Sequence, residues 1–400
     1  MAQITVGKLK IGQREEDALL EVIKSGQLSE GRKTFEFEKA WAAYIGTGFA
    51  IAFNSGTSGL IAGLTALKIK YNIKDGSKVV TSPLTFIATA NAIMHCGLQP
   101  VFVDVDRQKL VITPENIEAA VKKDKGIALI LPVHLMGYAV DMLAISKIAK
   151  KYGLRVMEDA SQAHGTLYNN KKLGSFSDLA IFSFYIAHNI QAGEMGAANT
   201  DNIELFKLLK KIKTHGRMCD CNVCSRHLGK CHLLKKYTNK EIDLDPRFYH
   251  DIIGFNFKTM EFQSALGLLQ LSKAQEIFEK RNFNVCYLNR GMKDLEGVLQ
   301  LPEYSEQVSY LAYPLVIKDS RIISRFRLRR ELEHRGIETR PLFGCIPTQQ
   351  PAYRFLEKKY KNKLPVAEYL GLNGFYIGCH QYLEKADLDK IISVFHEVLK

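Results

Sequence analysis

A glycine-rich turn, FNSGTSGL at residues 53–60, holds the first residues whose types and spacing could do chemistry. It follows an apolar run that predicts a strand, and it opens a run with helical spacing. The backbone N–H groups of Gly56, Thr57 and Ser58, with two hydroxyl groups, would face the positive end of that helix and could cradle a phosphate. A capping turn without a ligand, with Thr57 or Ser58 as the N-cap, is the alternative that this segment leaves open.

An acidic pair stands in MEDASQAHG at residues 157–165, at the end of a predicted strand. Because side chains alternate along a strand, Glu158 and Asp159 are expected on opposite faces of the sheet. Asp159 is the better candidate for a site, where its carboxylate could pair with a protonated ring nitrogen. A helix cap is the alternative interpretation.

The cysteines are unevenly distributed along the chain. Half of the eight lie within CDCNVCSRHLGKC, namely Cys219, Cys221, Cys224 and Cys231. The N-terminus has no continuous apolar leader, so we expect a cytoplasmic protein without a secretory signal. In that compartment, crowded cysteines indicate a metal site rather than disulfides.

The elements that must position these residues follow a regular alternation. Short apolar runs predict strands at 48–53, 78–83, 99–106, 127–134, 155–160 and 179–184. Runs with helical spacing separate them at 57–69, 85–96, 116–123 and 142–153. Repeated strand–helix units predict an α/β fold with a mostly parallel sheet and helices on both faces. Ligands of such sheets bind beyond the carboxyl ends of the strands, where the polar motifs fall.

The pattern changes after about residue 200, where long helices are expected, including one region at 260–295. The tail at 309–400 alternates strand and helix with its own apolar runs. We therefore expect a large α/β domain over 1–270, with a cysteine-rich insertion at about 215–240, and a smaller C-terminal α+β domain over 271–400.

Composition excludes several classes of protein. With 46% hydrophobic and 24% charged residues, the chain has the make-up of a globular protein with a large core. No apolar run reaches the roughly 18 residues that cross a bilayer, so no membrane partner is expected. The 55 Lys and Arg residues exceed the 42 Asp and Glu residues, but they are scattered rather than grouped. Small acidic substrates explain this charge better than nucleic acid does.

Eight motifs occur in an order that is typical of one family. They are SGTSGL, SPLTFIATANAI, VFVDVD, PVHLMG, EDASQAHG, LGSFSDLAIFSF, GFNFK at 254–258 and ETRPLF at 338–343. Over nearly its whole length the chain resembles the sugar aminotransferases of the DegT/DnrJ/EryC1/StrS type. These are fold type I pyridoxal-phosphate enzymes that act on nucleotide-linked keto sugars.

The resemblance implies a role for each motif residue. The phosphate would be held by Gly56, Thr57, Ser58 and Ser183. Phe86 would stack on the cofactor ring, Asp159 would pair with the ring nitrogen, and Gln162 would approach the phenolic oxygen. Asn256 would reach the phosphate of a partner subunit, which implies a homodimer with shared sites.

One position departs from the aminotransferase pattern. Aminotransferases of this family carry a lysine after the FSF run, which holds the cofactor as a Schiff base, and here the aligned residue is His188. Imidazole cannot form a stable imine, but it can move a proton near neutral pH. This change resembles the 3-dehydratases that make 3,6-dideoxysugars with pyridoxamine phosphate and no lysine link. A non-catalytic relative that binds the cofactor or a sugar nucleotide as a regulator is the alternative from another class.

Two kinds of 3-dehydratase share this change, and the cysteines bear on the choice. One kind is redox-neutral and uses glutamate, like GDP-4-keto-6-deoxymannose 3-dehydratase. The CDP-4-keto-6-deoxyglucose type adds a [2Fe–2S] cluster and takes electrons from a flavin and iron–sulfur, NAD(P)H-dependent reductase. Cys219, Cys221 and Cys231 stand where that type has cluster ligands, but Ser161 replaces its fourth cysteine. Cys224 could complete a local site, and structural zinc or another cluster stays open.

The sequence therefore predicts a homodimeric nucleotide-sugar 3-dehydratase with His188 as its base. The substrate would be a nucleotide-linked 4-keto-6-deoxyhexose, the cofactor pyridoxamine or pyridoxal 5′-phosphate, and the setting deoxysugar biosynthesis, most commonly for lipopolysaccharide. The cluster would pass electrons from the reductase. Basic residues beside the cysteines, among them Arg226, Lys230 and Lys235, are read either as a docking surface or as a solvated loop.

Overall fold

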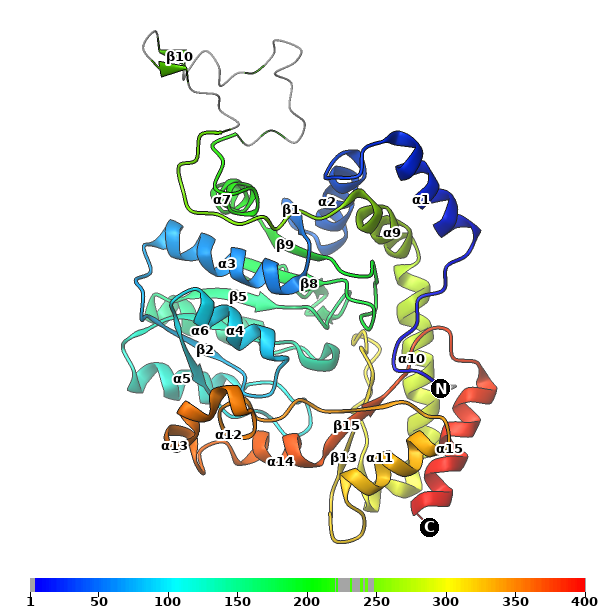
Figure 1. The fold of residues 1–400 in the computed structure, drawn as a ribbon. Helices are drawn as coiled ribbons and strands as arrows, with labels where there is room; N and C mark the ends of the chain where they lie inside the picture. The colour runs from blue at the N-terminus through cyan, green and yellow to red at the C-terminus, as the bar shows by residue number, and fades with distance from the viewer. Residues whose placement is uncertain are drawn as a thin grey trace.

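A computed structural model describes residues 4–219, 221, 231, 238–239, 242–243 and 248–399. Its largest element is a seven-stranded sheet in the order β1-β9-β8-β5-β4-β2-β3 (Figure 1). The strands are β1 (Phe49–Phe53), β2 (Lys78–Thr81), β3 (Gln99–Phe102), β4 (Ile127–Leu131), β5 (Arg155–Asp159), β8 (Leu179–Ser183) and β9 (Gly196–Thr200). Neighbours from β3 to β8 pair in parallel, and β9 runs antiparallel between β8 and β1.

Helices cover both faces of this sheet. α3 (Gly56–Tyr71), α4 (Ile87–His95) and α7 (Ile203–Lys213) pack on one face, and α5 (Pro114–Lys123) and α6 (Met142–Tyr152) pack on the other. Alternate side chains of one strand belong to different cores, as Leu129 and Ile130 do in β4. Strand alternation thus buries apolar side chains on both faces. The predicted α/β architecture is confirmed.

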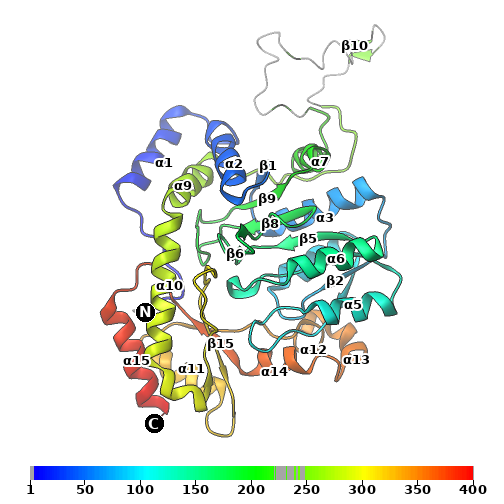
Figure 2. The same cartoon turned by 180° about the vertical axis from the view of Figure 1, so that it is seen from behind.

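A further group of helices packs at the β1 edge of the sheet. It consists of α1 (Gln13–Ser25), α2 (Arg32–Ile45) and α9 (Glu261–Ser272). Trp41 of α2 is fully buried there, with its ring 5.0 Å from that of Phe182 and 4.9 Å from that of Phe184. α10 (Ala274–Gly291) continues beyond α9 and reaches α15 (Lys385–Leu399) at the other end of the molecule (Figure 2).

The C-terminal part forms a second, antiparallel sheet in the order β12-β13-β15-β14. Its strands are β12 (Leu299–Gln300), β13 (Tyr313–Ile317), β14 (Thr339–Pro341) and β15 (Gly374–Ile377), joined with α11 (Arg325–His334), α14 (Pro365–Asn373) and α15. Shorter elements are η1 (Leu135–Gly137), β6 (Leu167–Tyr168), β7 (Lys171–Lys172), β10 (Thr238–Asn239), β11 (Ile242–Asp243), η3 (Lys293–Gly297), α12 (Ile346–Gln349), η4 (Pro351–Leu356) and α13 (Glu357–Tyr360). The smaller α+β unit is confirmed, and its boundary at residue 270 stays a prediction.

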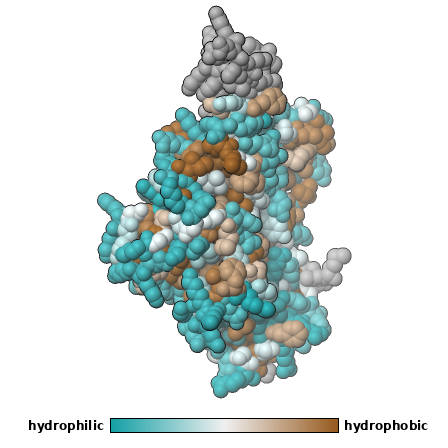
Figure 3. All heavy atoms as spheres, turned by 60° about the vertical axis from the view of Figure 1, so that its left-hand side comes forward, coloured by the Kyte–Doolittle hydropathy of each residue, from teal (hydrophilic) through white to brown (hydrophobic). Residues whose placement is uncertain are grey.

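The surface is largely polar. Figure 3 shows one face, on which apolar side chains form separate patches. The most exposed large apolar side chain in the described residues is Ile253, which is 91% exposed. In that part of the chain, no helix combines the length and apolarity needed to cross a membrane.

Candidate active site

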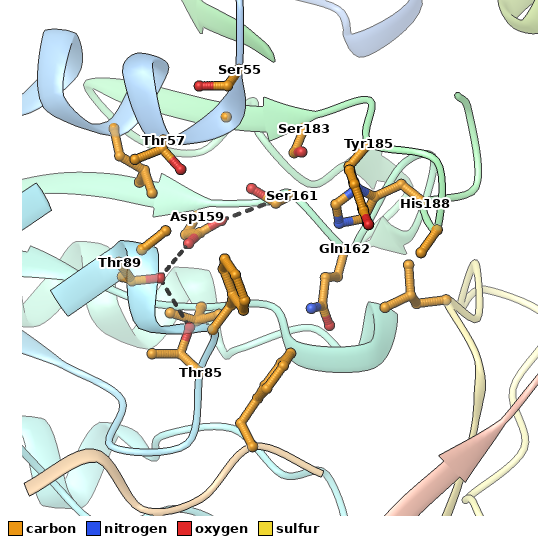
Figure 4. A pocket seen from close by; sticks show the side chains of 18 of the residues that line it. Ser55, Thr57, Thr85, Thr89, Asp159, Ser161, Gln162, Ser183, Tyr185 and His188 are labelled. Carbon is orange, nitrogen blue, oxygen red and sulfur yellow. Dashed lines mark hydrogen bonds between the residues drawn. The ribbon is translucent and has the colours of Figure 1, made fainter. Parts of the chain in front are cut away.

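A cavity of about 380 Å³ opens at the carboxyl ends of the parallel strands. Its walls come from the turn between β1 and α3, the start of α4, the ends of β5 and β8, and residues of the second sheet. Figure 4 shows side chains from these separate elements directed into one space. The structure brings together seven of the predicted residues, Gly56, Thr57, Phe86, Asp159, Gln162, Ser183 and His188. Ser58 and Asn256 do not line this cavity.

The turn before α3 packs tightly against the end of β8. A Cβ atom added to Gly56 would lie 2.7 Å from Ser183 Cβ, so glycine alone fits there without movement. Ser55, rather than Thr57 or Ser58, is the N-cap, and its Oγ accepts a hydrogen bond from the Ser58 N–H at 3.1 Å. The first-turn N–H groups of Gly56 and Thr57 remain at the cavity wall, a geometry that suits a phosphate. The phosphate contact expected for Ser58 stays a prediction.

Asp159 ends β5 and is 5% exposed. Its Oδ2 accepts a hydrogen bond from Thr89 Oγ1 at 2.8 Å, and its Oδ1 accepts one from the Ser161 N–H at 3.2 Å (Figure 4). Within the described residues, no basic side chain forms an ion pair with this carboxylate. Burying a carboxylate without a cation is costly. The carboxylate is suited to pair with a protonated ring nitrogen in the cavity.

Glu158 lies on the opposite face, as strand alternation predicts. It is fully buried and accepts hydrogen bonds from His134 Nε2 at 3.1 Å, the Gly174 N–H at 2.9 Å and Ser177 Oγ at 2.8 Å. Burial opposes its ionisation, but these donors outweigh burial and lower the pKa of the Glu158 carboxyl. Glu158 is thus an internal, hydrogen-bonded carboxylate, and Asp159 is the carboxylate that faces the cavity.

His188 lies beside the cavity in the loop that follows β8. Its backbone N–H donates to the Tyr185 carbonyl at 2.8 Å. Its ring Nδ1 is buried and has no hydrogen-bond partner in the described residues. Burial, and then the positive charge of Arg281, lower the pKa of His188 to about 3. The imidazole is therefore neutral at pH 7. None of the described residues that line the cavity is a lysine.

Phe86 and Gln162 both line the cavity. Phe86 is 56% exposed, and its ring centroid lies 5.9 Å from that of Phe343. An exposed aromatic ring on a cavity wall is suited to stacking on a planar ligand. Gln162 Oε1 accepts the Met136 N–H at 2.9 Å, which leaves the amide NH₂ group as a donor.

The residues present fit pyridoxal or pyridoxamine phosphate on three independent observations. Gly56 brings the start of α3 close to Ser183 at the cavity wall, Asp159 is a buried carboxylate without a cation, and Phe86 has an exposed aromatic ring. These features suit the phosphate, the ring nitrogen and the ring plane of that cofactor.

Asn256 is exposed and lies outside the cavity, where its backbone pairs with that of Thr214. Close packing fixes this segment, because a Cβ atom on Gly254 would lie 2.7 Å from the His215 carbonyl carbon. The role expected for Asn256 at a partner's phosphate stays a prediction.

The described cysteines do not by themselves form a metal site. Cys219, Cys221 and Cys231 are half-buried, and Cys224 lies outside the described residues. Among the residues that the structure describes, no group of three or more His, Cys, Asp or Glu side chains is placed to hold a metal ion. The basic residues Arg226, Lys230 and Lys235 also lie outside them. Ser161, which the resemblance placed at the position of a fourth cluster ligand, lines the cavity.

Sequence reasoning missed several residues of the cavity. They are Ser55, Thr85, Thr89, Tyr185, Glu194, Arg340, Phe343 and Tyr376. Thr89 had a readable signal, because it follows Thr85 by one helical turn, and their hydroxyl groups lie 2.9 Å apart. Arg340 stands in ETRPLF, but only the packing of the second sheet against the first brings it to the site.

Comparisons with known proteins place the chain among sugar-modifying enzymes. Residues 9–396 match the DegT/DnrJ/EryC1/StrS aminotransferase family. The lipopolysaccharide biosynthesis protein RfbH of Salmonella typhimurium is 32% identical over 399 residues, which cover 97% of this chain and 90% of that protein.

Solved structures share the whole fold. The GDP-4-keto-6-deoxy-D-mannose-3-dehydratase of E. coli, with bound hydrated PLP, has a TM-score of 0.86 and 26% identity over 100% of both chains. Another structure of that dehydratase holds a trapped PLP-glutamate geminal diamine. PseC, an aminotransferase of Helicobacter pylori, has a TM-score of 0.85 and 26% identity over 99% of both chains. The predicted PLP-enzyme fold is confirmed, and because both activities match it equally, side chains must decide between them.

Proposed function

Because this chain belongs to the DegT/DnrJ/EryC1/StrS aminotransferase family, we propose that it removes the C3 hydroxyl group of a nucleotide-linked 4-keto-6-deoxyhexose. Deoxysugar biosynthesis is the setting that its family and relatives support. The observation that carries the 3-dehydratase proposal is His188, which lies at a cavity whose described lining contains no lysine. When bound, pyridoxamine phosphate supplies an amine for the keto group and a conjugated ring that accommodates an electron pair.

His188 acts as the base in this proposal. Its imidazole is unprotonated at neutral pH, because burial and Arg281 lower its pKa to about 3. The buried Nδ1 leaves Nε2 as the ring nitrogen that can take up a proton from the cavity. A lysine amine would instead be protonated or bound covalently to the cofactor. The proposal thus assigns proton transfer, without covalent attachment, to this position.

The other residues hold and orient the cofactor. Asp159 stabilises a protonated ring nitrogen, and the hydrogen bonds from Thr89 and Ser161 fix its carboxylate. Gln162 is held by the Met136 N–H and presents its amide donors to the phenolic oxygen. The first-turn N–H groups of α3 and the Ser183 hydroxyl group bind the phosphate.

The charge of Arg340 favours a substrate that contains an anionic nucleotide. It is the one permanently charged cation among the described residues that line the cavity, and it comes from β14 of the second sheet. Its guanidinium is held by Glu338 at 3.0 Å, and Glu338 also accepts the Val6 N–H at 2.8 Å. We assign the diphosphate of the nucleotide sugar to this side of the cavity.

The electron supply is proposed from the cysteine spacing. Cys219, Cys221, Cys224 and Cys231 support a [2Fe–2S] cluster reduced by a flavin and iron–sulfur reductase. The second candidate is the redox-neutral, glutamate-dependent route with structural zinc, and it is favoured by the fold match to a dehydratase that was trapped with PLP and glutamate. About two irons and two sulfides per chain in anaerobically purified protein would support the cluster. Zinc without sulfide would overturn it in favour of the second candidate.

A homodimer with shared sites is also proposed. Asn256 lies outside the cavity of its own chain and three residues from Ile253, the most exposed large apolar side chain described. Phe255 and Met260, close to it in the chain, are exposed as well, and a group of exposed apolar side chains is typical of an interface. In the dimer, Asn256 of each protomer would approach the phosphate bound by its partner.

The experiment that tests the function separates catalyst from binder. Protein loaded with pyridoxamine phosphate is given a nucleotide-linked 4-keto-6-deoxyhexose, and exchange of the C4′ proton with heavy water is followed by mass spectrometry. We expect exchange in the parent protein and loss of at least about 100-fold in His188→Asn, the size of a lost general base. Binding without exchange in the parent would contradict the proposal and favour a regulator. A His188→Lys variant that turns over like the parent would show that the reaction does not depend on His188 as its base.

A further inference from the structure

The first described residues of the chain pack against the second sheet. We call residues 4–8 the N-terminal strap. Ile4 pairs in parallel with Ile337, and the Glu338 N–H donates to the Ile4 carbonyl at 2.8 Å. The side chains of Ile4 and Val6 are 1% and 2% exposed. The strap therefore extends the edge of the sheet at β14 and belongs to the packed core.

Glu338 joins the strap to the cation of the cavity wall. Its Oε2 accepts the Val6 N–H at 2.8 Å, and its Oε1 accepts a hydrogen bond from Arg340 Nε at 3.1 Å. Arg340 Nη2 lies 3.0 Å from the same Oε1, and the Arg340 side chain is 38% exposed. A guanidinium has five N–H donors, which is more than one carboxylate oxygen can take up. Arg340 therefore keeps donors for a ligand.

The backbone fixes where the Arg340 side chain starts but not where its charge lies. Arg340 of β14 pairs in register with Tyr376 of β15, and both residues line the cavity. An arginine side chain that is free to rotate loses conformational entropy when it binds a ligand. The contact with Glu338 removes much of that freedom before a ligand arrives, and the Val6 N–H in turn fixes the Glu338 carboxylate.

Close packing on two sides keeps the strap in place. A Cβ atom on Gly7 would lie 3.1 Å from Ala187 Cα, in the loop that carries His188. On the other side of the strap, a Cβ atom on Gly378 would lie 2.1 Å from the Thr5 carbonyl oxygen. The backbone N–H group between these two contacts therefore has little room to move.

We propose that Glu338 and the N-terminal strap are parts of the substrate site, in which Glu338 is a positioning residue that directs the Arg340 guanidinium toward an anionic group of the substrate. A diphosphate is the anion that the proposed function requires, and its identity rests on that function. The dependence of anion binding on Glu338 and on the strap does not rest on it. The two can therefore fail separately.

The test is the binding of inorganic pyrophosphate to the full-length chain loaded with pyridoxamine phosphate, measured by isothermal titration calorimetry. Glu338→Asp keeps the charge but shortens the side chain, so that its carboxylate cannot hold both partners at the present distances. Val6→Pro removes the N–H donor and leaves Glu338 intact. Glu331→Asp is the matched control, because it shortens a glutamate that is paired with Arg335 outside the cavity. Thermal unfolding of each variant checks the fold.

We expect the parent to bind pyrophosphate and Arg340→Met to bind it at least about 10-fold more weakly. Glu338→Asp and Val6→Pro should each weaken binding about 10-fold, and Glu331→Asp should match the parent. If Glu338 acted through its charge alone, Glu338→Asp would bind like the parent, and that result would overturn the proposal.

Three further results would also count against the proposal. They are a parent that does not bind pyrophosphate, binding that does not depend on Arg340, and a folded Val6→Pro variant that binds like the parent. If Val6→Pro does not fold, Glu338→Asp decides. Pyrophosphate binding that depends on Glu338, in a protein without C4′ proton exchange, would contradict the proposed function and leave this inference standing.

Discussion

Neighbouring carboxylates in β5 have different environments and should respond differently to the same change. Asp159 has hydroxyl and amide donors but no cation in the described structure, and Glu158 is enclosed by His134, Gly174 and Ser177. We predict that Asp159→Asn weakens pyridoxamine phosphate binding about 10- to 100-fold, the worth of one charge-assisted hydrogen bond. Its unfolding free energy should not fall. A fluorescence titration with the cofactor and a urea unfolding curve would measure the two effects, and unchanged affinity would remove Asp159 from the site.

Glu158→Gln should give the converse result, which is a loss of stability without a loss of cofactor affinity. The loss of a buried, paired carboxylate is expected to cost about 3 kcal/mol of unfolding free energy at pH 7. Because the folded pKa of Glu158 lies below its ordinary value of 4.5, the parent's advantage is present above that pH and is lost as pH falls through the folded pKa. Urea unfolding at pH 7 and pH 4 checks this. A difference between parent and variant that grows on acidification would contradict the assignment.

At the scale of the element, the start of α3 determines the phosphate cradle. A methyl group on Gly56 would collide with Ser183 Cβ, so Gly56→Ala must displace either the helix start or the end of β8. We predict a loss of about 1–3 kcal/mol in stability and a weaker affinity for the cofactor phosphate. Gly297→Ala is the matched control, because a Cβ atom there meets nothing within 4 Å. Equal behaviour of the two variants would show that the close approach has no consequence.

Regular elements were predictable because their signals are local. Apolar runs at the expected spacing located six of the seven strands of the large sheet and the helices between them. The seventh, β9, was missed because Gly196–Thr200 consists of small and polar residues, of which only Thr200 favours strands, and pairing with its neighbours β1 and β8 makes it a strand. The helical region expected at 260–295 is interrupted at Lys273, which separates α9 from α10.

Only the site residues that stand in motifs at the ends of strands could be predicted from the sequence. Phe86, Asp159, Gln162 and His188 meet as expected. The N-cap residue could not be identified from the sequence, because Ser55, just before Gly56, can cap a helix as well as Thr57 or Ser58 can. Arg340 lines the cavity together with residues that lie far earlier in the chain, and no spacing rule reports such contacts.

At the scale of the whole molecule, the proposed homodimer makes Ile253 a sensitive position. The side chain is 91% exposed in one chain and would be covered in a dimer. We predict that Ile253→Asp shifts the mass measured by light scattering from dimer to monomer and lowers cofactor affinity, because Asn256 of the partner is then missing. Lys258→Asp, at an exposed position nearby, is the control for added charge. A parent protein that is already monomeric would refute both the dimer and the role of Asn256.

The central claim is that the C3 oxygen leaves the sugar, and a heavy-oxygen label at C3 tests it most directly. The labelled nucleotide-linked 4-keto-6-deoxyhexose is incubated with the protein, pyridoxamine phosphate, and either glutamate or a chemical reductant. We predict that the label appears in water and that the sugar product has lost one oxygen atom. A 4-amino sugar that retains the label at C3 would show an aminotransferase and would contradict the role assigned to His188.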